Sequence, residues 1–155
     1  MKKNKFKKKM LLKYKKENLI TLLKWRNDKV ARNNSLNNNK VTFNKHKQWI
    51  NNKIKNKKNK IYIYYFLKKP IGMCSVIKKK ESFYLGYSID KNFRGKSHSK
   101  NMLRLFLKKI KNKFYKNKIF AIVLLKNKKS IKILADINFK KVSGNKKYIK
   151  MKLIF

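Results

Sequence analysis

Hydrophobic and polar positions change their spacing along the chain, and these changes predict the order of helices and strands. A short apolar cluster in residues 8–15 predicts a first strand, and apolar residues in 17–25 recur at helical spacing. An asparagine-rich loop over residues 33–40 precedes a second helix, for which Thr42 is a plausible cap. One face of that helix carries Phe43, His46, Ile50 and Ile54, with Trp49 at its edge.

The middle of the chain has the β-branched and aromatic composition of strands. Residues 61–67 and 71–77 predict a hairpin, because the segment KKPIG between them supplies a turn. Residues 82–89 form a third run of the same kind, so these three strands are expected to make an antiparallel meander.

The last third of the chain returns to helical spacing and then alternates between helix and strand. A stripe of apolar residues follows Ser99, at Leu103, Phe106, Leu107, Ile110 and Phe114. The continuous apolar run 119–125 predicts a central strand, and a strand–helix–strand order predicts a parallel crossover. Residues 127–137 predict a helix, and 139–142 and 147–155 predict strands paired through a turn at 143–145. The whole order predicts one domain over residues 1–155, with a mixed α/β sheet and helices on its faces.

Charge is the unusual feature of the composition. The 47 lysines and arginines face five acidic residues, for a formal net charge of +42. That balance is typical of proteins that bind nucleic acid or an anionic membrane. However, only four basic residues are arginine, and the abundance of Lys, Asn, Ile, Phe and Tyr is typical of an AT-rich coding sequence. Nucleic-acid binding therefore stays open but is not favoured.

Cysteine usage and hydropathy narrow the setting. The single cysteine, Cys74, excludes an internal disulfide and a multi-cysteine metal site, and it fits a reducing compartment. No apolar run approaches the roughly 18 residues needed to span a bilayer, and the basic start lacks the apolar stretch of a signal peptide. We expect a soluble cytoplasmic protein with no metal and no membrane partner.

The loop from Arg94 to Ser99 joins a strand to the start of a helix and carries candidate chemistry. The first N–H groups of a helix have no internal partner, and the helix dipole favours negative charge there. The loop thus predicts a phosphate site, with Lys96 and Lys100 as added point charges. The alternative is an ordinary strand-to-helix turn, which also contains small and basic residues.

Two segments of the chain resemble motifs of the GNAT superfamily of acetyl-CoA-dependent N-acetyltransferases. Arg94, Ser97 and Ser99 occupy the three defining positions of a loop similar to the family's pyrophosphate loop. The segment from Asn127 and Ser130 to Phe139 is similar to the family's Asn-x-x-Ser helix. The resemblance implies a GNAT-like, mostly antiparallel sheet of about seven strands with about four flanking helices. It implies acetyl-CoA as cosubstrate, held by Ile89, Arg94, Gly95, Lys96, Ser97, His98, Ser99, Lys100, Asn127 and Ser130.

The chain departs from the family pattern at three positions. Serine replaces glycine in the loop, and a serine with a positive φ costs on the order of 1 kcal/mol. Leu134 stands where many relatives carry a tyrosine that reprotonates the leaving thiolate, so that role is vacant or filled elsewhere. Asn138 replaces a glycine, and asparagine also adopts the left-handed region.

The front of the chain resembles the GNAT branch that acetylates nucleotide-linked deoxyamino sugars, notably the 4-amino-sugar step of pseudaminic acid biosynthesis. A UDP-amino-sugar acceptor carries two phosphates and a base, which arginine and aromatic side chains bind. The resemblance implies substrate contacts from Arg26, Arg32, His46 and Trp49. The alternative is that Trp25 and Trp49 are core residues and that His46 packs on its helix.

Acetyl transfer to an amine needs an oxyanion donor and a proton acceptor. Backbone amides of the strand from Tyr84 to Ile89 can polarise the carbonyl, because in the GNAT fold this strand pairs with the pantetheine arm. Few carboxylates are available as base. Candidates are Glu81, Asp90 and His46, of which Glu81 acting through a water is preferred, against the alternative of a solvated hairpin charge.

Tyr84 and Tyr87 are expected on one face of their strand, where either can relay a proton.

Two other functions stay open beside the sugar-nucleotide enzyme. One is a ribosomal-protein-type N-acetyltransferase, and the other is a degenerate, RNA-associated binding module. A homodimer is also open.

Overall fold

The structure, a computed structural model, describes residues 8–155. The basic segment at the start of the sequence, considered above for a signal peptide, lies partly outside these residues. The first half contains β1 (Lys9–Lys13), η1 (Lys16–Asn18), α1 (Leu19–Asn27), α2 (Lys29–Asn33), α3 (Phe43–Lys55), β2 (Lys60–Phe66) and β3 (Lys69–Lys79). The second half contains β4 (Ser82–Ile89), η2 (Lys91–Phe93), α4 (His98–Phe114), β5 (Ile119–Leu124), α5 (Lys128–Ala135), β6 (Phe139–Gly144) and β7 (Tyr148–Leu153).

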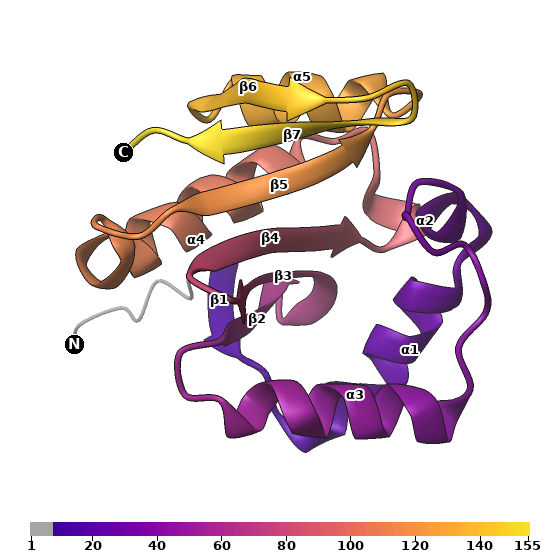
Figure 1. Cartoon of the computed structure of the whole chain (residues 1–155). Coiled ribbons are helices and arrows are strands. Elements are labelled where there is room, and N and C mark those ends of the chain that lie inside the picture. Colours follow the sequence, from indigo (N-terminus) through magenta and orange to yellow (C-terminus); the bar gives the residue numbers. More distant parts are fainter. Residues whose placement is uncertain (1–7) are drawn as a thin grey trace.

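Seven strands form one sheet in the order β1-β2-β3-β4-β5-β7-β6 (Figure 1). Neighbouring strands are antiparallel except β4 and β5, which α4 connects as a parallel crossover. This arrangement confirms the expected mixed, mostly antiparallel α/β sheet and its β2–β3–β4 meander.

The sheet splits between β4 and β5. These strands pair at two positions near their starts, Phe83 with Ile119 and Tyr84 with Phe120. Beyond these pairs the strands diverge toward the end of the molecule that carries α2 (Figure 1). The carboxyl end of β4, which leads into the loop before α4, therefore lies on the widening side of the split.

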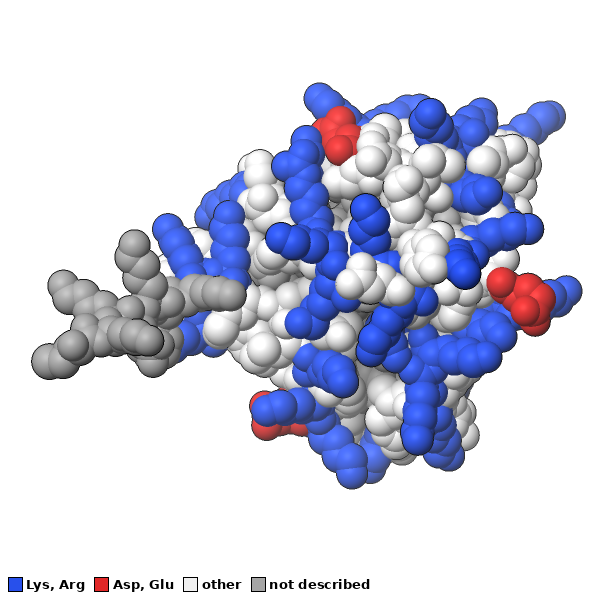
Figure 2. Space-filling view, turned by 90° about the vertical axis from the view of Figure 1, so that its left-hand side faces the viewer, with Lys and Arg blue, Asp and Glu red and all other residues white. Residues whose placement is uncertain are grey.

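Lysine and arginine side chains crowd the end of the molecule where α4 finishes and β5 begins (Figure 2). Acidic side chains are sparse on this face. The high formal charge of the sequence is therefore concentrated at the surface, as a folded core requires.

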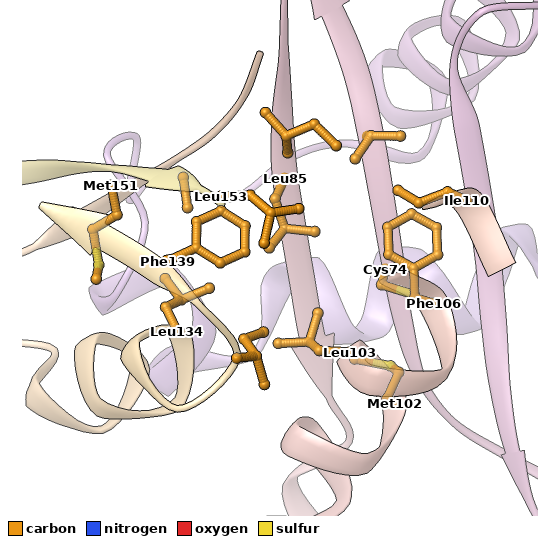
Figure 3. Close-up of a cluster of buried hydrophobic side chains, with 14 of the residues drawn as sticks. Cys74, Leu85, Met102, Leu103, Phe106, Ile110, Leu134, Phe139, Met151 and Leu153 are labelled. Atoms are coloured by element: carbon orange, nitrogen blue, oxygen red, sulfur yellow. The ribbon is translucent and has the colours of Figure 1, made fainter. Parts of the chain in front are cut away.

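Helices cover the two faces of the sheet unequally. On one face α4 and α5 bury a large cluster that includes Phe106, Leu134 and Phe139 (Figure 3). This cluster joins β3 and β4 to β6 and β7, so side-chain packing continues across the split. On the other face, α1 and α3 pack Leu22, Trp25 and Ile50 on Ile61, Ile63 and Ile77.

Three local expectations differ from the structure. The helix α2 was not expected, since its residues lack an apolar stripe; the Asp28 carboxylate caps it by accepting a hydrogen bond from Ala31 N. The β2–β3 turn is at Leu67 and Lys68, both with positive φ, and Pro70 lies within β3. The last hairpin turns after Gly144, later than expected, where Asn145 Oδ1 accepts hydrogen bonds from Lys147 N and Tyr148 N.

No helix within residues 8–155 is long and apolar enough to cross a membrane.

Candidate functional site

The loop from Arg94 to Ser99, which leads into α4, has the backbone conformation of an anion-binding site. We call this loop the cradle. Gly95 has φ +74°, and a Cβ built there would meet no atom within 4 Å. Ser97, the N-cap of α4, also has a positive φ of 59°, and its side chain makes no capping hydrogen bond within the described chain. The first N–H groups of α4 therefore lack a side-chain cap, as an anion site requires.

The Arg94 side chain holds this loop in place through two contacts. Its Nε donates to the main-chain oxygen of Ile89 at 3.1 Å, and its Nη2 lies 2.7 Å from Asp28 Oδ1. Burial alone would raise the pKa of Asp28, but hydrogen bonds from Ala31 N and Arg94 lower it. Arg94 thus joins the end of β4 to the cap of α2, which makes it a positioning residue in this structure.

A second contact joins the same two regions. Trp25 Nε1 donates to Asp90 Oδ2 at 2.9 Å, and the Trp25 side chain is 3% exposed. Trp25 is therefore a core residue, as the alternative interpretation held. Burial would raise the pKa of Asp90, yet hydrogen bonds from Asn92 N and Trp25 lower it, so this carboxylate is a poor proton acceptor.

The other basic residues of the loop differ in position. Lys100 Nζ lies 2.7 Å from Asp136 Oδ2, which ties the start of α4 to the end of α5. Lys96 Nζ lies 5.9 Å from the centre of the Phe93 ring and stays exposed. Lys96 is thus the lysine of this loop with no ion pair among the described residues.

His98, the first residue of α4, anchors the start of the helix in the core. Its buried ring packs against Phe66, Phe93 and Tyr64, with centroids 4.8, 5.9 and 6.0 Å away. Burial, followed by the charges of Lys9 and Lys96, lowers the pKa of His98. The main chain of His98 and Ser99 belongs to the first turn of α4, so their N–H groups face the loop.

The edge of β4 beyond Tyr84 offers free backbone groups. The N–H of Phe83 points toward β5 and donates to Lys118 O at 2.9 Å. Since backbone groups alternate along a strand, the N–H groups of Leu85 and Tyr87 point to the same side; the pairing of Tyr84 with Phe120 uses that of Leu85, whereas that of Tyr87 lies beyond the last pair with β5. Farther along this edge, the main-chain oxygen of Ile89 accepts a hydrogen bond from Arg94 Nε, so this oxygen is not free.

Tyr87 links this edge of β4 to α5. Its hydroxyl lies 2.6 Å from Ser130 Oγ, and Ser130 N donates to Asn127 Oδ1, which caps α5. Burial raises the pKa of Tyr87, although the Ser130 contact lowers it in part. The phenol is therefore protonated at neutral pH and can donate a proton.

Comparison with known proteins agrees with this geometry. Residues 10–140 match the acetyltransferase (GNAT) domain family. The chain belongs to the GNAT family. No curated protein matches the sequence at a significant level.

Solved structures share the GNAT fold at low sequence identity. An N-acetyltransferase from Staphylococcus aureus Mu50 has a TM-score of 0.80 and 21% identity, covering 95% of this chain and 98% of its own. Spermidine N-acetyltransferase from Vibrio cholerae, in complex with CoA and spermine, has a TM-score of 0.79 and 14% identity, covering 94% of this chain and 94% of its own. Ribosomal-protein-alanine N-acetyltransferase from Brucella melitensis has a TM-score of 0.80 and 18% identity, covering 94% of this chain and 99% of its own. These likenesses confirm the fold of this GNAT domain.

The two tyrosines do not share a face, and that expectation was wrong. Tyr84 pairs with Ile77, which belongs to the cluster under α1 and α3. Tyr87 pairs with Cys74, which belongs to the cluster under α4 and α5. The reason is the two-residue period of a strand, which sends side chains three positions apart to opposite faces. The Tyr84 ring instead lies near Phe120, with Lys79 and Lys150 over it.

Glu81 lies far from the cradle. It is exposed beside Lys80 in the β3–β4 turn, at the start of β4, whereas the cradle follows the end of that strand. Eight residues of strand separate the two sites by about 23 Å. The structure thus places Glu81 among the lysines of the hairpin, at the Tyr84 end of β4 and away from the cradle.

The four expected acceptor residues of the GNAT domain lie together on α1, α2 and α3. Arg32 donates from Nε to Asn27 O and from Nη1 to Asn38 O, so main-chain oxygens occupy its guanidinium. Arg26 donates from Nη2 to Asn37 O, but its buried Nη1 has no partner in the described chain. Arg26 is therefore better placed than Arg32 to bind an added acceptor atom.

His46 and Trp49 stack on α3 with ring centroids 6.1 Å apart. His46 is 5% exposed, and its Nε2 is the second buried nitrogen here that lacks a partner among the described residues. Burial, followed by the charge of Arg26, lowers the pKa of His46, which keeps the ring neutral near pH 7. Trp49 is 42% exposed and offers an open ring face, so it is not a core residue.

Positions on α5 and after it agree with the GNAT pattern in different degrees. Asn138 has φ +69°, so asparagine does take the left-handed conformation expected in place of glycine. Leu134 is fully buried in the core, and its aliphatic side chain has no proton to donate, so the tyrosine role is not filled at this position. Asp28 and Asp90 were not identified as supports of the loop, because no local pattern signals contacts 66 and 65 residues apart.

Proposed function

We propose that this GNAT domain transfers an acetyl group from acetyl-CoA to a primary amine on a nucleotide-linked deoxyamino sugar. The observation that carries the transferase step is the uncapped start of α4 beside the unpaired edge of β4. The observation that favours an anionic acceptor is the pair of unpartnered nitrogens, Arg26 Nη1 and His46 Nε2, in a chain of +42 formal charge.

The residues present fit acetyl-CoA. The open space at Gly95 and the positive φ of Gly95 and Ser97 leave room for a diphosphate against the amides of residues 96–99. Lys96 supplies the nearby positive charge. The N–H group of Tyr87, beyond the last pair with β5, can hold the pantetheine arm and polarise a carbonyl oxygen. When bound, acetyl-CoA supplies the activated acetyl group as a thioester.

Proton transfers need an acid and a base near the split. The Tyr87 hydroxyl, held at 2.6 Å by Ser130, is the group we assign to protonate the leaving thiolate. It occupies the role that Leu134 cannot fill. The strongly positive protein favours the neutral form of the acceptor amine, so attack needs no strong base.

The positive charge of the protein favours an anionic acceptor over a cationic one. A polyamine is a multiply charged cation and is repelled by a surface with 47 basic and five acidic residues. A sugar nucleotide carries two phosphates and is attracted by the same field. Movement of the segment 34–40 that takes the Asn37 oxygen away from Nη2 would free the Arg26 guanidinium to bind a phosphate. The exposed Trp49 ring then offers a stacking surface for the base.

The experiment is CoA-thiol release with three acceptors: a UDP-4-amino-deoxysugar, spermidine and a peptide with an N-terminal alanine. We expect turnover with the sugar nucleotide and little with the two others. The variant Arg26→Gln should raise KM for the sugar about tenfold and leave KM for acetyl-CoA unchanged. Arg104→Gln, an exposed arginine on α4, is the matched control. Turnover with the peptide alone would contradict the proposed acceptor, and no turnover with any amine would contradict the transferase role.

A further inference from the structure

A second concentration of positive charge lies at the opposite end of the sheet from the cradle. A hollow with a volume of about 430 Å³ opens between the α3–β2 connection, the β3–β4 hairpin and the end of α4. Its charged lining residues are Lys57, Lys58, Lys60, Lys78, Lys113 and Glu81. We call this hollow the lysine pocket. It lies about 23 Å from the carboxyl end of β4, so it is separate from the proposed active site.

The lysine pocket has a fixed floor. Phe83 on β4 and Phe114 on α4 line it and pack edge to face, with centroids 4.8 Å apart. Asn59 holds the wall: its Nδ2 donates to Lys53 O, and its Oδ1 accepts from Lys78 N, each at 2.8 Å. The lysines therefore come from three different parts of the chain, which the Asn59 side chain and the packing of Phe83 on Phe114 hold together.

Charge in the lysine pocket is not balanced by the protein. The ion pairs within residues 8–155 join Arg94 to Asp28 and Lys100 to Asp136, so Glu81 pairs with none of the five lysines. Lys60 Nζ donates to the main-chain oxygen of Lys57 and is partly buried. Burial, followed by the charges of Lys113 and Lys13, lowers the pKa of Lys60. Ammonium groups held close together without a counter-charge are a source of repulsion that a bound anion relieves.

We propose that the lysine pocket binds adjacent phosphate groups, such as those of an oligophosphate or of an RNA backbone. Lysine presents a point charge with no fixed fork, which suits phosphate oxygens without reading a base. The aromatic floor is covered by core packing, so the contacts available to a ligand are the ammonium groups. The face that carries the pocket is crowded with lysine, which adds long-range attraction (Figure 2).

The test measures binding of inorganic tripolyphosphate and of a single-stranded oligouridylate to the full chain at about 150 mM salt. The variant Lys60→Gln/Lys113→Gln removes two pocket charges. The control Lys140→Gln/Lys141→Gln removes two charges from exposed positions on β6. We expect the pocket variant to weaken tripolyphosphate binding about tenfold and the control to change it by less than about twofold. For RNA, the salt slope should fall by about 1.4 in the pocket variant and by less in the control.

The two ligands distinguish the source of the phosphates. Weaker binding of both ligands, or of one of them, in the pocket variant supports the proposal. Loss of tripolyphosphate binding alone assigns the pocket to a free oligophosphate, and loss of RNA binding alone assigns it to a nucleic-acid backbone. Equal losses in the pocket variant and the control would overturn it, because general charge would then account for binding. Far-UV circular dichroism checks the fold, and Lys58→Gln/Lys78→Gln gives a second variant should the first unfold. Acetyl transfer should persist in all these variants, so failure here is distinguishable from failure of the proposed function.

Discussion

Asp28 accepts a 2.7 Å hydrogen bond from Arg94, 66 residues later in the chain. The same carboxylate oxygen caps α2 through Ala31 N at 3.0 Å. One side chain therefore fixes both the start of α2 and the loop that forms the anion cradle. This contact, with the one between Trp25 and Asp90, is how the front of the chain positions the expected acetyl-CoA loop.

Two substitutions at Asp28 should separate its two contacts. Asp28→Asn keeps a capping oxygen but loses the ion pair, so we expect a stability loss of less than about 1 kcal/mol. KM for acetyl-CoA should rise severalfold, because Arg94 is released. Asp28→Ala also loses the cap and should lower stability by about 1 kcal/mol more. Urea unfolding and steady-state kinetics measure these effects, and an unchanged KM in both variants would contradict the supporting role of Arg94.

Gly95→Val should abolish stabilisation by acetyl-CoA. The backbone at Gly95 has φ +74°, which strains a β-branched residue, and its Cβ would project into the space left for the diphosphate. Lys80→Val is the matched control, since Lys80 also has a positive φ, of 53°, but lies at the far end of β4. Thermal melting with and without acetyl-CoA gives the readout. A ligand-induced shift that survives in Gly95→Val would remove the cradle from the binding site.

Tyr87→Phe should lower kcat about 100-fold and leave KM for acetyl-CoA nearly unchanged, because the hydroxyl donates a proton and the ring keeps its packing. Ser130→Ala should have a smaller effect of the same kind, since it leaves the phenol without its 2.6 Å partner. Tyr84→Phe, on the opposite face of β4, is the control. A loss in Tyr84→Phe equal to that in Tyr87→Phe would count against the assignment of the acid.

Stability should fall as the pH drops below about 6.5, the ordinary pKa of histidine in an unfolded chain. Burial lowers the folded-state pKa of both His98 and His46, so the unfolded chain binds more protons in this range. The contribution of each histidine is fully present above the unfolded pKa and is lost as the pH falls toward the folded one. His98→Leu should flatten the decline, and adding His46→Leu should flatten it further. Urea unfolding between about pH 5 and 7.5 measures this, and unchanged slopes would show that neither ring is buried in its neutral form.

Long elements were predictable because their apolar spacing is dictated by the core. The stripe on α4 and the continuous run of β5 carried enough signal to predict the parallel crossover. The short helix α2 was not predictable from apolar spacing, since its five residues carry no apolar stripe and the capping residue Asp28 is a weak signal by itself. The β2–β3 turn was misplaced because Leu67 and Lys68 adopt positive φ without glycine, a choice that composition does not reveal.

The candidate site was predictable where one segment makes it and not where several do. The loop from Arg94 to Ser99 could be recognised from its own residues. The opposite orientations of Tyr84 and Tyr87 follow from strand alternation and were open to prediction. The lysine pocket was not, because in a chain with lysine throughout, no pattern shows which ammonium groups converge from separate segments.

The five acidic residues in this sequence have few substitutes. Asp28, Asp90 and Asp136 each connect two separate parts of the fold. The protein should therefore tolerate substitution of its lysines better than substitution of these aspartates. Neutralising single surface lysines leaves dozens of similar groups in place, whereas neutralising any of these three aspartates removes one of the few side-chain links between distant parts of the described chain.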